Sequence, residues 1–137
     1  MKIVLDTNTV ISGLLWKGAP RQILDLARSG SLTLFTSPEL LAELANVLER
    51  KKFSARLALA ETNVDELVYG YAALAKTIRP AKIKPMIKVD SDDDKVLACA
   101  KAAKAEVITS GDDHLLNLEE YEGIRILTVN QLIAEVQ

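Results

Sequence analysis

The chain has 137 residues, of which 49% are hydrophobic and 26% are charged. These values are ordinary for one globular domain that buries a core without disulfides or a structural metal, so we expect a single domain over residues 1–137. The net charge is −2, so the overall charge gives no reason to expect a nucleic acid or a membrane as partner.

Short apolar runs alternate with helical periodicity along the chain. The predicted strands, in chain order, are 2–5, 32–36, 107–109 and 124–128, with a further edge strand at 76–79 or 87–89. The predicted helices are 9–15, 20–29, 38–50, 64–74 and 92–104. Their expected N-caps include Ser37, either Thr62 or Asn63, and Ser91. This alternation predicts an α/β fold with a central, mostly parallel sheet covered by helices.

The single cysteine, Cys99, excludes an intramolecular disulfide and a multi-cysteine zinc site, and it favours a cytoplasmic protein. Its alanine-rich surroundings predict a small core residue. No apolar stretch approaches the roughly 20 residues of a membrane span, and no signal segment opens the chain. We therefore expect no membrane partner.

Charge is unevenly distributed. Residues 50–88 hold nine Lys or Arg and three acids, whereas residues 89–122 hold ten acids and three lysines. This segregation is compatible with an anionic ligand beside a metal site, and equally with two solvated faces.

Two acids are placed by the predicted strands. Asp6 ends the strand 2–5, and Asp112 closely follows the strand 107–109. Because ligands of parallel α/β sheets gather outside the carboxyl ends of the strands, both acids are expected at the same edge.

Two further acids lie on helices and also have structural explanations. Glu43 falls at the margin of a buried stripe, where a half-exposed acid often bonds locally. Asp94 lies in the first turn of a helix, where acids are favoured by the dipole, and secondary structure alone does not place it at either edge. Asp112 also has a structural explanation, because an Asp at this position can form a turn.

Taken together, these acids lack a lysine or arginine beside them at a strand end. Crowded carboxylates repel one another, and a hard divalent cation with oxygen ligands resolves that repulsion. A cation held there can activate water and stabilise charge on an attacked phosphate. The pattern therefore favours metal-dependent phosphodiester hydrolysis.

Four segments in order carry a resemblance to a known family. They are 3–8, 37–44 with 47–48 and 52–53 after it, 92–98, and 108–116. At these segments the chain resembles the PIN-domain ribonucleases, especially the VapC-type toxins of toxin-antitoxin systems. The resemblance implies a five-stranded parallel sheet between helices, a homodimer, an RNA substrate and a cognate antitoxin protein.

The resemblance also implies roles for individual residues. The implied acidic quartet that binds Mg²⁺ or Mn²⁺ is Asp6, Glu43, Asp94 and Asp112, with Asn8 and Ser110 orienting ligands or water. Asp90, Asp92 and Asp93 compete with Asp94, which is preferred because Leu97 and Ala98 follow it by three and four residues. Asp113 competes with Asp112, which directly follows Ser110 and Gly111.

Other residues are candidates for contact with RNA. The plausible phosphate contacts are Arg50, Lys51, Lys52 and Arg56, and a second cluster of Arg79, Lys82, Lys84 and Lys88. His114 fits either helix-start packing or a substrate contact, and Trp16 fits either packing and dimer contact or stacking on RNA.

The sequence thus predicts a metal-dependent endoribonuclease, and the resemblance implies that it is a toxin component of a toxin-antitoxin system. The alternatives are a non-catalytic RNA- or protein-binding module of the same fold and an RNA-processing nuclease that is not a toxin. An aspartate-based phosphatase or phospho-receiver fits poorly, because Asn8 stands where the phosphatase motif requires a second Asp.

Overall fold

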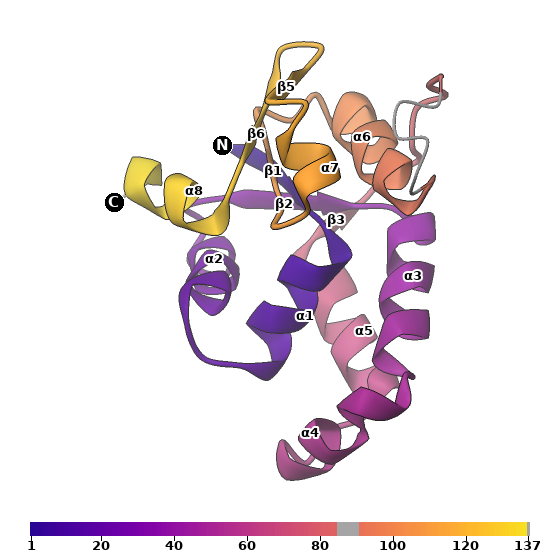
Figure 1. Ribbon diagram of the computed structural model, residues 1–137. Coiled ribbons are helices and arrows are strands. Elements are labelled where there is room, and N and C mark those ends of the chain that lie inside the picture. The colour runs from indigo at the N-terminus through magenta and orange to yellow at the C-terminus, as the bar shows by residue number, and fades with distance from the viewer. Residues whose placement is uncertain (85–90, 137) are drawn as a thin grey trace.

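A single sheet organises the computed structural model of the protein, which describes residues 1–84 and 91–136. Within these residues the sheet has six strands in the order β3-β2-β1-β4-β6-β5 (Figure 1). The strands are β1 (Lys2–Leu5), β2 (Thr33–Thr36), β3 (Lys76–Thr77), β4 (Val107–Thr109), β5 (Glu120–Tyr121) and β6 (Ile124–Leu127). All neighbours pair in parallel except β5 and β6. The α/β fold with a mostly parallel sheet is confirmed.

The expected number of five strands was wrong, because β5 adds an antiparallel edge. Glu122 and Gly123 connect β5 to β6 with φ angles of 48° and 84°. Positive φ at both central residues is typical of the tight turn that joins two hairpin strands. Of the two expected edge strands, 76–79 corresponds to β3, and 87–89 lies outside the described residues.

The helices cover both faces of the sheet. They are α1 (Thr7–Leu15), α2 (Ala19–Arg28), α3 (Pro38–Leu48), the 3₁₀ turn η1 (Lys51–Phe53), α4 (Ser54–Leu59), α5 (Val64–Leu74), α6 (Ser91–Ala103), α7 (Asp113–Leu116) and α8 (Val129–Val136). Ser37 caps α3 and Asn63, rather than Thr62, caps α5 through side-chain hydrogen bonds. No helix within the described ranges is both long enough and apolar enough to cross a membrane.

The core has two parts, one on each face of the sheet. Ile3 and Leu5 of β1 pack with residues of α1, α2, α3, α5 and α8, whereas Val4 packs with α6 and Leu115 of α7. Successive side chains of a strand point to opposite faces, so this alternation fixes the register of β1. The result is a sheet between two helical layers, with α1 and α6 on opposite sides of it (Figure 1).

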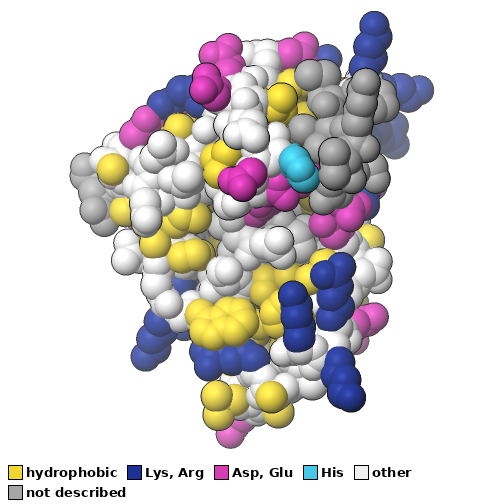
Figure 2. Space-filling view, viewed as in Figure 1, with side chains coloured by type: hydrophobic (Ala, Val, Ile, Leu, Met, Phe, Trp, Pro, Cys, Tyr) yellow, Lys and Arg dark blue, Asp and Glu magenta, His cyan; other side chains and the backbone are white. Residues whose placement is uncertain are grey.

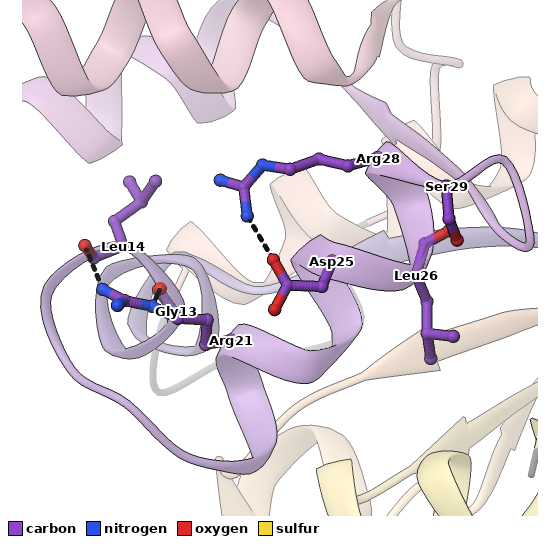
Figure 3. Close-up of polar contacts among 7 residues, drawn as sticks. All are labelled: Gly13, Leu14, Arg21, Asp25, Leu26, Arg28 and Ser29. Carbon is purple, nitrogen blue, oxygen red and sulfur yellow. Dashed lines mark hydrogen bonds and ion pairs between the residues drawn. The ribbon is translucent and has the colours of Figure 1, made fainter.

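Helices α1 and α2 approach each other closely at Gly13. The Arg21 side chain of α2 donates hydrogen bonds to the carbonyl oxygens of Gly13 and Leu14, both at 3.1 Å (Figure 3). These bonds satisfy carbonyls near the end of α1 that lack partners within the helix. They hold the first turn of α2 against the end of α1, the helix that begins at Asp6.

We expect Gly13→Ala to lower the free energy of unfolding by about 1–3 kcal/mol, as overpacking substitutions do. A Cβ at this position would lie 2.9 Å from Leu24 Cδ1 and 3.0 Å from the Pro20 carbonyl oxygen. Gly70→Ala in α5 is the matched control, because a Cβ there meets nothing within 4 Å and should stabilise the helix. Urea unfolding measures both, and a Gly13→Ala protein as stable as the control would contradict the expectation.

Candidate metal centre

Asp6 joins the end of β1 to the start of α1. Its side chain is buried, with 6% exposed, and Oδ1 accepts a hydrogen bond from Thr9 N at 2.9 Å. A carboxylate is favoured here because the first backbone N–H groups of a helix lack partners and the helix dipole is positive at this end. Oδ2 accepts a hydrogen bond from the Ser110 hydroxyl. Each oxygen has a further lone pair, so Asp6 can still bind a cation.

Ser110 connects Asp6 to Asp112. It follows β4, which pairs in parallel with β1, so both strands end at the same edge. The fully buried Ser110 Oγ donates to Asp6 and accepts from Asp112 N at 2.9 Å. The structure therefore places both acids at one edge and links them through one hydroxyl.

A potential cation-binding group lies beside this link. One ligand atom each from Asp93, Asp112 and His114 lies within 4.8 Å of the others. The Asp112 side chain is 30% exposed, and its Oδ1 accepts from His114 N at 2.7 Å while lying 3.5 Å from His114 Nδ1. Asp113, the competing acid, is exposed on α7. Two carboxylates and an imidazole are a donor set that suits a divalent cation.

Helix α6 supplies Asp93 to this group. Strand β3 is parallel to β2, so the chain leaves β3 at the carboxyl edge, and α6 begins there before leading back to β4. Asp93 is 7% exposed. It was named in sequence reasoning only as a competitor of Asp94.

The acids next to Asp93 lie in other surroundings. Asp94 lines a separate hollow of about 260 Å³ that also contains Glu39 and Pro80. Asp92 forms an ion pair with Lys95 at 2.6 Å, and Asp90 lies outside the described residues. Adjacent residues of a helix point about 100° apart, so these neighbouring acids at the start of α6 point in different directions. The geometry places Asp93 in the group with Asp112 and His114, and the choice of Asp94 as a ligand stays a prediction.

Glu43 lies on α3, the helix that contacts both α1 and α6. It is half-buried, and its Oε2 atom is shielded from solvent. Glu43 is not part of the group formed by Asp93, Asp112 and His114. Its place in the acidic quartet stays a prediction.

A pocket of about 480 Å³ opens beside the linked acids. Asp6, Asn8, Ser110, Asp112 and Asn130 contribute to its lining, and no Lys or Arg is among its described lining residues. Asn8 is exposed at this site, and its role in orienting a ligand stays a prediction. Figure 2 shows acidic side chains and the single histidine close together near the centre of the face in view.

Two buried groups, Tyr71 and Cys99, hold their protons more firmly than usual. Burial, with smaller electrostatic contributions from the neighbouring Cys99 and Asp6, raises the pKa of Tyr71 above its usual range. Burial and then Glu39 raise the pKa of the Cys99 thiol to about 12. A thiol that keeps its proton is a poor metal ligand. Cys99 is fully buried, which confirms the prediction of a core residue.

The predicted cationic contacts differ in exposure. Arg50, Lys51 and Lys52 are exposed, whereas Arg56 is half-buried and donates from Nε and Nη2 to the Leu15 carbonyl oxygen at 2.9 and 2.6 Å. Sequence reasoning missed this structural role of Arg56. In the second cluster Arg79, Lys82 and Lys84 are exposed, and Lys88 lies outside the described residues.

Comparisons with known proteins cover most of the chain. A family model described as "PIN domain" matches residues 2–114. An uncharacterized protein of Methanocaldococcus jannaschii is 29% identical over 137 residues, which span 99% of this chain and 85% of the relative.

Proposed function

The chain belongs to the PIN-domain family, a nuclease-like fold, and from this premise we propose that it is a metal-dependent endoribonuclease acting on single-stranded or structured RNA. The observation that carries the proposal is the convergence of Asp93, Asp112 and His114, with Asp6 tied to Asp112 through Ser110. These residues come from three elements that meet at the carboxyl edge of the sheet.

The carboxylates of Asp6, Asp93 and Asp112 fit Mg²⁺ or Mn²⁺. Both ions prefer oxygen ligands, and Mg²⁺ retains several waters, so a few carboxylates suffice. The pocket beside Asp6 and Asp112 leaves room for water and for a phosphate. Bound there, the cation would supply activation of water and stabilisation of phosphate charge.

The side chains have separate tasks in this proposal. Asp6 and Asp112 hold the cation, and Ser110 fixes the spacing between them. Residues that orient metal ligands in this way contribute about 10- to 100-fold to metal affinity or activity. His114, half-exposed beside Asp112, can donate a hydrogen bond to a phosphate oxygen.

The third and fourth acids are proposed on different grounds. We assign the third position to Asp93 because of its proximity to Asp112, although the family motif had suggested Asp94. Glu43 is retained as the fourth acid on the resemblance, supported by its shielded Oε2 atom.

A biological role as the toxin of a toxin-antitoxin pair is a further part of the proposal and rests on resemblance. It would imply a cognate antitoxin, a homodimer and a cytoplasmic location, with residues 1–137 as one domain. An RNA-processing nuclease that is not a toxin would use the same chemistry. A short gene for a DNA-binding protein immediately upstream would favour the toxin.

Metal removal tests the chemistry. We expect the protein to cleave labelled single-stranded RNA with Mg²⁺ or Mn²⁺, to lose cleavage when a chelator is added, and to regain it when the ion is restored in excess. The products should carry 5′-phosphate and 3′-hydroxyl ends, as the resemblance implies. Gel analysis of several RNAs measures this.

The control separates this activity from contamination and from mere binding. Cleavage that persists in the chelator, or absence of cleavage across varied RNAs, would contradict the proposal. Calorimetric titration with Mn²⁺ provides a second readout, because a non-catalytic module without a metal centre would give no binding heat.

A further inference from the structure

Trp16 forms an exposed aromatic surface at the end of α1. It is the C-cap residue of that helix, and 41% of its surface is exposed. The Arg56 guanidinium lies over the indole at 5.2 Å from the ring centroid, and the Phe53 ring meets it edge-on at 6.4 Å and 62°. We call Trp16, Phe53 and Arg56 the indole platform.

The indole platform is held in place by partly buried contacts. Arg56 donates two hydrogen bonds to the Leu15 carbonyl oxygen, and Phe53 is 8% exposed. These contacts anchor the cation over one part of the indole while a large part of the ring stays open to solvent. An aromatic side chain that is already ordered loses little conformational entropy when it binds a ligand.

The surroundings of the indole platform are cationic. Residues 50–60 contain four Lys or Arg and no acid, and Lys17 follows Trp16 directly. Lys52 Nζ lies 5.1 Å from the Phe53 ring centroid, and Lys51 and Lys52 are both exposed. Figure 2 shows Lys and Arg side chains around a hydrophobic patch on the face that carries the acidic centre.

The position of the indole platform relative to the acids is set by α1. Asp6 caps the start of this helix and Trp16 its end. At about 1.5 Å of rise per residue, α1 separates them by roughly 15 Å. An extended strand of a few nucleotides can bridge such a distance.

We propose that the indole platform binds a flanking nucleotide of single-stranded RNA, with its base stacked on Trp16 and neighbouring phosphates near Lys51 and Lys52. An aromatic ring among cations is the combination that binds single strands without reading sequence. The cations argue against a contact between two copies of the chain, since lysine is depleted in protein interfaces. The proposal rests on the proposed function for the identity of the ligand.

The single tryptophan makes the proposal directly measurable. The probe is a single-stranded RNA of about ten nucleotides, within the site sizes that such proteins cover, added to the full chain in chelator so that no cleavage occurs. We expect saturable quenching of Trp16 fluorescence that weakens as salt is raised. A Lys51→Ala and Lys52→Ala double variant should reduce the salt slope by about 1.4, the value for two phosphate contacts on a single strand.

Anisotropy of labelled RNA tests the stacking. Trp16→Ala should weaken binding roughly 5- to 150-fold without changing the salt slope, as loss of one stacked base does. Tyr69→Ala is the matched control, because Tyr69 is a highly exposed aromatic on α5 and should leave affinity unchanged.

The outcomes separate this proposal from the nuclease. RNA binding that leaves the fluorescence of Trp16 unchanged overturns the stacking, even if metal-dependent cleavage stands. A fluorescence change with protein concentration alone, without RNA, overturns it in favour of a contact between copies. Quenching with the expected salt dependence upholds it, even if no cleavage follows when Mg²⁺ is added.

Discussion

Replacement of Asp6 by Asn is expected to reduce metal-dependent RNA cleavage by at least about 100-fold, since loss of residues that merely orient a ligand already costs 10- to 100-fold. Asn keeps the shape of the side chain and remains a good helix N-cap, so the bond from Thr9 N can persist. Its amide can donate to the Ser110 hydroxyl, which also accepts hydrogen bonds. The change therefore removes the negative charge and one cation ligand while preserving the local fold.

The measurement is the initial rate of cleavage at saturating Mn²⁺, with thermal unfolding as a check on the fold. Asp25→Asn is the matched control, because this exposed α2 carboxylate lies at the surface, where it forms an ion pair with nearby Arg28. Its rate should stay within about 2-fold of wild type, as expected of an exposed pair that contributes little. An Asp6→Asn protein that cleaves as fast as this control would remove Asp6 from the metal centre.

The elements that the sequence predicted well are those with long or fully apolar patterns. Strands β1 and β4 are short apolar runs, and α3 and α6 span three or more turns, enough for helical periodicity to appear. Strand β5 has two residues and α7 has four, so neither is long enough to generate a pattern. The turn at Glu122 and Gly123 was the available signal for β5, since a two-residue connection ending in Gly is typical of hairpins.

The site was only partly predictable for a related reason. Asp6 and Asp112 follow directly from parallel strands, whose ends must share an edge. The start of α6 depended on β3, a two-residue strand whose parallel pairing decides where the following helix begins. The role of Arg56 depended on a contact with Leu15, 41 residues away in sequence, which no local pattern reveals.

Asp93 and Asp94 provide the sharpest test of the centre. We expect Asp93→Asn to lower cleavage by at least about 100-fold, and Asp94→Asn to leave it within about 3-fold of wild type. Asp93 is 7% exposed, and its carboxylate lies near the carboxylate of Asp112 and the imidazole of His114. Asp94 instead lines a different hollow with Glu39. The two substitutions are chemically identical and one residue apart, so each serves as the control for the other.

Titration with Mn²⁺ by calorimetry should agree with the cleavage rates, because a lost ligand weakens cation binding whether or not RNA is present. Thermal unfolding of both variants shows whether either one has lost its fold. If Asp94→Asn abolishes metal binding while Asp93→Asn retains it, the motif spacing of Leu97 and Ala98 locates the ligand better than the geometry of α6. If both variants lose the metal, the start of α6 contributes two carboxylates, and the centre is larger than the three-residue group.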